Sequence, residues 1–454
     1  MDSLTDISLV SGAVPAVAWL LGLSGAAYLL ARRGRRWPLT VLVAAAAAVL
    51  LTALAEWLLV DVFSVFPEEL PAEVLLWWAA SLAGVGLAVA TFLRFAACRP
   101  ASRRRRVLAP VAMLGVLLLA VVQINLYFSI NPTLGDLLGT TVAGIPTLES
   151  KYTRAADAAS ASAVTPAEVP GHLAADKAVA GQWRPPADLP AHGLLRQAVV
   201  PGTVSGFVAR NAYIYLPPAY LVPGHPPLPV LVLFPGQPGA PSDWLTGGQL
   251  ASTLDSYAAA HSGLAPVTVV VDPLGSQDAN TLCMDSTIAR ADTYLSVDVP
   301  QWISTTLDVQ PGADRWAVGG FSFGATCALQ LAARHPDVFP NVIAFAAERE
   351  PALAKDRSKT IQEAFGGNAE AFDSRTPLVI LASTRFVHSS AYFSAGADDT
   401  AFVADMSELS AAARGAGFRV ETSTVPGIGH SWAVPVRKMD EALGFLAPGL
   451  GLTR

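Results

Sequence analysis

The sequence predicts a doubly wound α/β domain preceded by an all-α transmembrane region of four helices. Three observations predict it. Four apolar runs fill the first 130 residues, charged residues make up only 15% of the 454-residue chain, and β-rich runs alternate with helical stretches from about residue 196 onward. Ordinary soluble domains carry about 25% charged residues. We therefore expect a transmembrane region over 1–130, a linker over 131–195 and the α/β domain over 196–454.

The apolar runs are each as long as the ~20 helical residues that cross a hydrocarbon core. Arginine-rich links at 32–36 and 99–106 alternate with an acidic N-terminus and an acidic link at 61–73. Arginine-rich loops stay in the cytoplasm, so we expect a multi-pass protein of the cell membrane whose chain after about residue 130 is extracytoplasmic. A cleaved signal peptide is the alternative for the first apolar run, but it would need a basic start, and this N-terminus is acidic. The predicted spans cover 10–31, 38–60, 73–98 and 107–128.

The chain from about 145 to 195 is rich in alanine, proline and serine and shows no apolar periodicity, which predicts a linker. Beyond it, short continuous β-rich runs with helices between them are typical of a parallel sheet covered on both faces. A first strand is expected within "FVARNAYIYLP" (207–217). The later strands are expected at 229–236, 265–273, 315–322, 341–348, 377–383 and 418–425.

The stretch "GGFSFGAT" (319–326) places three glycines around Ser322, between a predicted strand and a predicted helix. It contains the pattern G-x-S-x-G, in which the serine occupies a sharp, strained strand-to-helix turn and the glycines avoid side-chain collisions. A chance match is common in a glycine-rich chain, but one between a β run and a helix is not. This context predicts Ser322 as a nucleophile.

A serine hydroxyl needs a base to become a good nucleophile. In this arrangement the chain order is serine, acid, histidine. Of the histidines that follow Ser322, His335 ends the helix after the nucleophile and His388 leaves little room for a preceding acid. His430 lies in "PGIGHSW", directly after the last predicted strand. We therefore predict His430 as the general base.

The acid of the triad is expected after strand 377–383 or its continuation. The stretch "YFSAGADDT" offers two adjacent aspartates, and a Gly-x-x-Asp spacing selects Asp399. Asp398 stays an alternative, and Glu348 and Glu350, after an earlier strand, are outside candidates.

The oxyanion hole needs two backbone N–H groups. One is expected from Phe323, the residue after the serine, and the other from the loop "PGQPG" after strand 229–234. Pro235 and Pro238 have no N–H, so Gln237 is the expected second donor.

These motifs resemble the esterase D branch of the α/β-hydrolases, which includes the mycobacterial mycolyltransferases, over about residues 196–447. The resemblance implies an esterase, thioesterase or acyltransferase that works through an acyl-enzyme. This family usually has His-Gly where the chain has Pro235-Gly236. The four-helix region is no part of the common family fold and is similar to that of actinobacterial membrane-anchored versions. The motifs are "YIYLPPAY", "LPVLVLFPGQPG" with "DW" after it, "TYLSVDVPQWI", "GFSFGA", "AFGGNAEAF" and "PGIGHSW".

The three cysteines, Cys98, Cys283 and Cys327, match no zinc or redox spacing, so we expect no metal and no cofactor. Cys327 opens the helix after the nucleophile, and Cys283 follows a neighbouring strand of this fold. We expect a disulfide between them, with two buried free thiols as the alternative. A net charge of −6 without a basic block outside the membrane loops indicates no nucleic-acid partner.

These patterns together predict a membrane-anchored, extracytoplasmic serine esterase or lipase-like hydrolase. Its substrate is expected to be a lipid or cell-envelope ester, with Ser322, His430 and Asp399 as the catalytic residues. One alternative is an acyltransferase of the mycolyltransferase type, which needs the same residues. The other is a catalytically silent binding protein, against which the intact order of serine, acid and histidine argues. The acyl group, the head group and the oligomeric state have no signature in the sequence.

Overall fold

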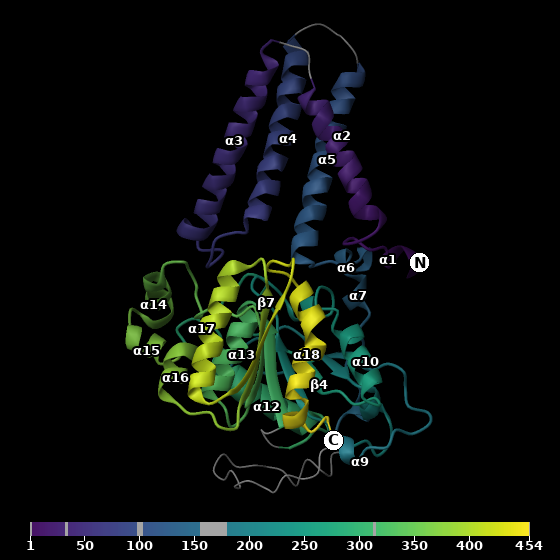
Figure 1. Ribbon diagram of the computed structural model, residues 1–454, viewed down its shortest axis with the longest axis vertical. Helices are drawn as coiled ribbons and strands as arrows, with labels where there is room; N and C mark the ends of the chain where they lie inside the picture. Colours follow the sequence, from purple (N-terminus) through teal and green to yellow (C-terminus); the bar gives the residue numbers. More distant parts are fainter. Residues whose placement is uncertain (1, 32–34, 98–102, 155–178, 312–314, 454) are drawn as a thin grey trace. The chain divides into compact units, whose positions relative to one another are not determined.

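The computed structural model describes residues 2–31, 35–97, 103–154, 179–311 and 315–453. The chain divides into two compact units. The first, here called the helical unit, comprises Met1–Thr140 and Ala352–Arg357, and the second, here called the sheet unit, comprises Thr141–Pro351 and Ser358–Arg454. Figure 1 shows the ribbon of each unit.

The helical unit contains four long helices. Helix α5 packs against both α2 and α4, and α3 packs against α4. Four stretches are long and apolar enough to cross a membrane: Ala13–Leu30, Trp37–Val62, Ala72–Leu93 and Val107–Phe128. The helices of this unit are α1 (Asp2–Thr5), α2 (Ala13–Leu30), α3 (Trp37–Trp57), which continues into the π-helix η1 (Leu58–Val62), α4 (Ala72–Ala97), α5 (Arg103–Phe128) and α6 (Leu134–Leu137).

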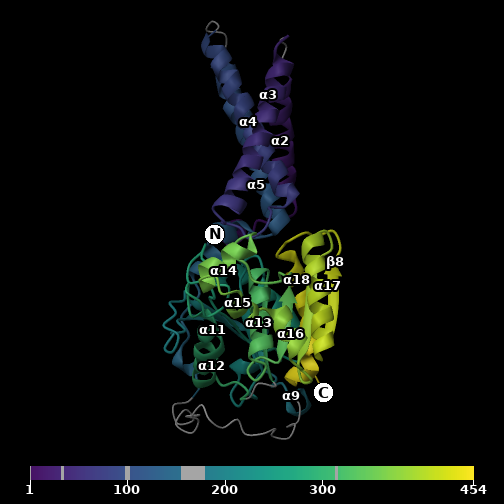
Figure 2. The same ribbon diagram turned by 90° about the vertical axis from the view of Figure 1, so that its left-hand side faces the viewer.

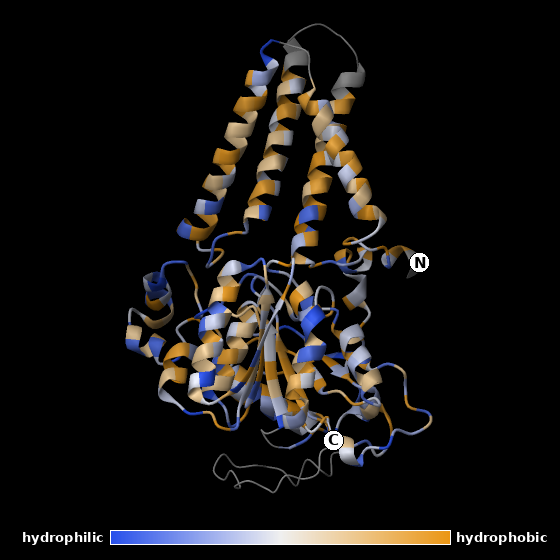
Figure 3. Ribbon diagram, viewed as in Figure 1, coloured by the Kyte–Doolittle hydropathy of each residue, from blue (hydrophilic) through white to orange (hydrophobic). Residues whose placement is uncertain are grey.

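Hydrophobic residues make up much of these long helices (Figure 3). Leu42 is 66% exposed and Leu50 is 71% exposed. Water would disfavour so much uncovered apolar surface, whereas lipid chains would not. The four predicted apolar helices are therefore confirmed. Residues 32–34 and 99–102 of the two arginine-rich links, and Cys98 before the second link, lie outside the described residues.

The sheet unit is built on eight strands in the order β1-β2-β4-β3-β5-β6-β7-β8. Strand β2 runs antiparallel to β1 and β4, and the neighbours from β4 to β8 run parallel. The doubly wound α/β class is thus confirmed. The strands are β1 (Leu194–Ala198), β2 (Ala212–Leu216), β3 (Val230–Phe234), β4 (Val267–Val270), β5 (Trp316–Phe321), β6 (Asn341–Phe345), β7 (Ser390–Gly396) and β8 (Arg419–Val425).

Helices cover both faces of the sheet, which explains why its central strands are apolar throughout. Helices α10 and α18 pack together on one face, and α13, α16 and α17 pack in a row on the other (Figures 1 and 2). The longer helices are α10 (Leu250–Ala260), α12 (Val299–Thr306), α13 (Phe323–Arg334), α14 (Arg357–Phe365), α16 (Pro377–Ser383), α17 (Thr400–Ala416) and α18 (Ala433–Leu450). The short ones are α7 (Thr140–Ala143), η2 (Ser150–Tyr152), α9 (Val179–Gln182), η3 (Pro218–Leu221), η4 (Pro241–Trp244), α11 (Ala291–Thr293), η5 (Tyr294–Asp298) and α15 (Ala369–Asp373).

The prediction of a strand at 377–383 is wrong, because this segment forms helix α16. Thr376 occupies the N-cap position and Pro377 the first turn, where proline is favoured because its missing N–H has no partner in any case. A short apolar run fits a buried strand and a buried helix equally well. The strand lies thirteen residues later, as β7, which is fully buried but carries small and polar residues.

Part of the predicted linker is folded onto the sheet unit. The backbone amide of Leu148 donates to the carbonyl of Gln197 in β1 at 2.9 Å, and the Gln197 amide donates to the Pro146 carbonyl at 2.9 Å. Ile145 packs into the main apolar core. Residues 155–178 lie outside the described residues.

Candidate active site

Ser322 lies at the turn between β5 and α13, with backbone angles φ 57° and ψ −126°. Such angles are rare for a residue with a Cβ atom and are held here by the surrounding structure. A Cβ atom on Gly320 would lie 2.2 Å from the Gly324 carbonyl, and one on Gly324 would lie 2.3 Å from the Phe234 carbonyl. Glycines at both positions therefore let strand, turn and helix approach closely enough to form the sharp turn.

The structure brings the hydroxyl of Ser322 to His430. The Oγ atom of Ser322 lies 2.9 Å from Nε2 of His430, and Nδ1 of the same ring lies 2.9 Å from Oδ2 of Asp399. The three side chains come from the ends of β5, β8 and β7, which lie on the same edge of the parallel sheet. The side chains of His430 and Asp399 are 15% and 11% exposed, so the contacts are largely shielded from water.

Asp399, at the N-cap position of α17, is the aspartate whose carboxylate contacts the imidazole. The preceding residue, Asp398, is exposed, and its backbone amide donates to the carbonyl of Ile428 at 3.0 Å. The side chains of adjacent residues at the end of a strand point in different directions. Only one of the two neighbouring aspartates can therefore face His430. Glu348 lies beside α13, where its amide donates to Oγ1 of Thr326 at 2.9 Å.

Two phenyl rings pack against the imidazole of His430. The ring of Phe321 lies 4.9 Å from it, tilted by 28°, and the ring of Phe402 lies 4.2 Å away, tilted by 37°. Trp432 packs on Phe321 with ring centroids 4.9 Å apart. Such packing restricts the orientation of the imidazole. Sequence reasoning missed Phe402, because only the placement of α17 brings this residue to the histidine.

The loop that follows β3 passes beside the nucleophile. A Cβ atom on Gly236 would lie 3.6 Å from Cβ of Ser322. Within the described part of the chain, the backbone amides of Gln237 and Phe323 donate to no other residue. They are therefore available to a ligand that lies beside the serine.

A buried ion pair between Arg210 and Asp272 contacts the loop that follows β3. Asp272, which is fully buried, accepts hydrogen bonds from Nε and Nη2 of Arg210 at 2.9 and 2.7 Å, and Nη2 of Arg210 also donates to the carbonyl of Gly239 at 3.0 Å. Burial would raise the pKa of Asp272, but the hydrogen bonds from the side chain and amide of Arg210 hold this pKa below its ordinary value. Sequence reasoning did not find this pair, because its members are 62 residues apart.

Cys283 and Cys327 are joined as a disulfide whose Cα atoms are 5.4 Å apart. Both cysteines are fully buried. Among the residues that the structure describes, no group of three or more histidine, cysteine, aspartate or glutamate side chains is arranged to hold a metal ion.

Comparison with known proteins places this geometry in context. Residues 208–438, about half of the chain, match the Esterase family model, described as "Putative esterase". An uncharacterized protein of Corynebacterium glutamicum is 38% identical over 252 residues, which are 53% of this chain and 59% of that protein. The MPT51 antigen of Mycobacterium leprae is 34% identical over 98 residues, 22% of this chain and 29% of the antigen.

The chain thus spans less than two thirds of the length of either curated relative. Among solved structures, an S-formylglutathione hydrolase from Agrobacterium tumefaciens is similar, with a TM-score of 0.48 and 18% identity. That similarity covers 57% of this chain and 97% of the hydrolase.

Proposed function

Because the chain belongs to the Esterase family, we propose that its sheet unit is a serine esterase that works through an acyl-enzyme at Ser322. The observation that carries the proposal is the continuous contact from Ser322 through His430 to Asp399, with 2.9 Å at each step. This geometry is the one that general-base activation of a serine requires.

In the first step the Oγ atom of Ser322 bonds to the ester carbonyl carbon, and its proton passes to Nε2 of His430. The Asp399 carboxylate accepts a hydrogen bond from Nδ1–H of the ring and stabilises the imidazolium, without taking the proton. When the tetrahedral intermediate breaks down, the imidazolium gives its proton to the departing alcohol. In the second step the imidazole takes a proton from water, whose oxygen bonds to the acyl carbon. The imidazolium then returns a proton to Oγ of Ser322 as the bond from Oγ to the acyl carbon breaks, which releases the acid and the free serine.

The negative charge that develops on the carbonyl oxygen needs preorganised donors. The amides of Phe323 and Gln237 supply them in this proposal, because both lie beside the serine and neither is used within the described structure. A single donor of this kind is worth about 10²- to 10³-fold in kcat. The absence of the family's usual His-Gly dipeptide leaves the backbone donor in place, since Gln237 contributes only its N–H.

For the substrate we propose a lipid or cell-envelope ester on the extracytoplasmic side of the membrane. The four apolar helices support membrane anchoring, and the arginines of the links 32–36 and 99–106 support an outer location for the sheet unit. The disulfide fits that location, because disulfides persist in oxidising compartments. An anchored enzyme reaches substrates in its own membrane without diffusing through bulk solvent.

The decisive experiment uses the full chain purified in detergent. A fluorophosphonate probe should label the wild-type protein and leave Ser322→Ala unlabelled, and labelled envelope lipids should release free acid only with the wild type. An unlabelled wild type would overturn the esterase and favour a silent binding module. Acyl transfer to an added sugar as the main reaction would show an acyltransferase instead.

A further inference from the structure

We propose that the Cys283–Cys327 disulfide and Gln330 are positioning residues that hold the second oxyanion donor, the amide of Gln237, in register with Ser322. The inference rests on the proposed function and adds residues to it that do not touch the substrate. It follows from a chain of contacts that leads from α13, the helix after Ser322, to residues 235–239, the loop that carries Gln237 and is here called the donor loop. The contacts pass through one intermediate loop, residues 272–284, here called the support loop.

The support loop holds the donor loop directly. The amide of Gly239 donates to the carbonyl of Gln277 at 3.0 Å, and Nε2 of Gln237 donates to the carbonyl of Asp278 at 3.3 Å. The residues on either side of Pro238 thus donate hydrogen bonds to two consecutive carbonyls of the support loop. A displacement of residues 277 and 278 therefore carries the Gln237 amide with it.

The support loop is in turn fastened at both ends. At its start, the Asp272 carboxylate accepts the amides of Leu274 and Gly275, both at 3.1 Å. At its end, Leu282 and Cys283 both have positive φ angles, 57° and 51°. This backbone region is rarely adopted by residues with a Cβ atom, so the local sequence does not favour the turn and contacts from outside must hold it.

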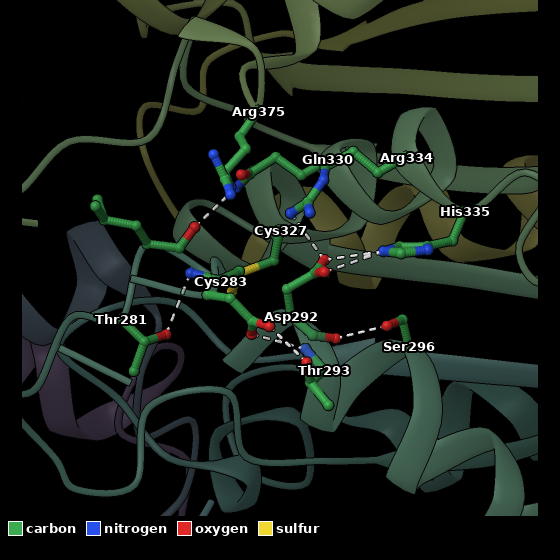
Figure 4. Close-up of polar contacts among 12 residues, drawn as sticks. Thr281, Cys283, Asp292, Thr293, Ser296, Cys327, Gln330, Arg334, His335 and Arg375 are labelled. Atoms are coloured by element: carbon green, nitrogen blue, oxygen red, sulfur yellow. Dashed lines mark hydrogen bonds and ion pairs between the residues drawn. A yellow bond between two sulfur atoms is a disulfide. The ribbon is translucent and has the colours of Figure 1, made fainter. Parts of the chain in front are cut away.

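Two of those contacts come from α13 (Figure 4). Nε2 of Gln330 donates to the carbonyl of Leu282 at 3.0 Å, and Cys327 forms the disulfide with Cys283. Gln330 is 1% exposed and both cysteines are fully buried. Within the loop, Oγ1 of Thr281 donates to the Pro273 carbonyl at 2.7 Å and accepts the Cys283 amide at 3.2 Å, which ties its end to its start.

Helix α13 starts directly after Ser322, so one rigid element carries the nucleophile, the first donor Phe323 and both anchors of the support loop. The helix therefore sets the distance between the two oxyanion donors. Because an oxyanion hole stabilises the transition state through donors placed within a fraction of an ångström, loosening the anchors should lower kcat more than it changes KM.

Helix α13 is joined a second time to the chain that follows β4, at a point beyond the support loop, and this contact provides a matched control. Asp292 in α11 contacts Nε2 of His335 at 3.1 Å and Nη1 of Arg334 at 2.9 Å, both at the end of α13 (Figure 4). This ion pair also fastens the chain after β4 to α13, but it lies beyond the support loop. Its loss should weaken the fold without moving the donor loop.

The experiment compares Cys283→Ala/Cys327→Ala and Gln330→Met with Asp292→Asn in the detergent-purified full chain. Active sites are titrated to completion with fluorophosphonate, and kcat and KM for a soluble ester are expressed per labelled serine. We expect the bridge and Gln330 variants to lose roughly tenfold or more in kcat, which is less than the 10²- to 10³-fold cost of a missing donor. The KM should change less than about twofold. The Asp292 variant should melt at a lower temperature and keep its kcat per labelled serine.

The outcomes separate this inference from the proposed function. A wild type that neither labels nor hydrolyses the ester overturns the proposed function. A wild type that does both, beside bridge and Gln330 variants with unchanged kcat per labelled serine, overturns the inference alone. If the double cysteine variant does not fold, Gln330→Met with the same titration gives the same decision, because it removes the other anchor of the support loop and leaves the disulfide in place.

Discussion

At the scale of single residues, the position of His430 depends mainly on neighbours that are distant in the sequence. Its loop, "PGIGHSW", contains two glycines and has little stiffness of its own. The ring is held instead by Asp399 and Ser322 at its two nitrogens and by Phe321 and Phe402 at its faces. Removing any one of these contacts should therefore act on the orientation of the imidazole.

Ser322→Ala and His430→Ala should each lower ester turnover by roughly 10³-fold or more, because the two side chains act as one unit. For the same reason the double variant should be little worse than either single variant. Steady-state rates of the three proteins test this, and losses that multiply in the double variant would contradict a shared acyl-enzyme step.

Asp399→Asn should be severe as well, because the amide favours the wrong imidazole tautomer. Asp398→Asn is the matched control, since Asp398 is the exposed neighbour. The same rate measurement decides between the two aspartates. A larger loss in Asp398→Asn would assign the acid to that residue instead.

Phe402→Ala should lower kcat about tenfold and leave KM nearly unchanged, because the imidazole gains freedom to turn away from Ser322. Phe402→Leu keeps most of the apolar volume and should recover most of the rate. Steady-state kinetics of both variants, with active sites titrated, test the steric role of this ring. A wild-type kcat in Phe402→Ala would show that the polar contacts alone orient the histidine.

At the scale of elements, the chain between β4 and α11 departs most from regular structure and yet is densely bonded. Asp272, directly after β4, bonds to Arg210 before β2 and to two amides of its own turn. A buried carboxylate of this kind is stabilising only while it is ionised and paired. We therefore expect this buried carboxylate to make the stability of the sheet unit sensitive to acid.

Asp272→Asn should lower the free energy of unfolding by about 2 kcal/mol at pH 7, the scale of a hydrogen bond to a charged group. The pKa of Asp272 is lower in the folded protein than in the unfolded chain. The stabilisation is thus complete above the unfolded value of about 3.9 and is lost as the pH falls through the folded value.

Thermal unfolding of the wild type and Asp272→Asn from pH 7 down to pH 3 tests this. The difference between their midpoints should shrink below about pH 4. Asp308→Asn, whose carboxylate is 54% exposed, serves as the control and should follow the wild type throughout. A difference that stays constant with pH would show that Asp272 does not titrate with folding.

At the scale of the whole molecule, two kinds of surface occur in one chain. The helical unit exposes leucine and valine on its long helices, whereas the sheet unit buries most of its apolar residues in one continuous core. The apolar surface of the helical unit is suited to a bilayer, and the surface of the sheet unit is suited to water. In the proposed topology, the arginine distribution sets the direction of insertion.

Alkaline phosphatase fused to the end of the full chain should be active and a fluorescent protein fused there should be dark, because we expect that end to be extracytoplasmic. Replacing the arginines of the links 32–36 and 99–106 with glutamine should weaken this preference. Fluorescence without phosphatase activity in the unchanged chain would reverse the topology and remove the envelope substrate from the proposal.

The sequence by itself determined the features that are coded locally. The four apolar helices, the alternation of strands and helices and the glycines around Ser322 depend on residue type and spacing over a few turns of chain. Such short-range patterns can be recognised without knowing which distant residues pack against them. Their weakness is equally local, since 377–383 forms α16 although its composition suits a strand just as well.

Only the tertiary structure decided which distant groups meet. It places the carboxylate of Asp399, not that of its neighbour, against His430, brings Phe402 to the imidazole and sets the support loop between α13 and the donor loop. These contacts join residues up to 48 positions apart, or they depend on which of two adjacent residues at the end of a strand faces the site. Sequence spacing carries no information on such distances, because they arise from how the sheet and its helices pack together.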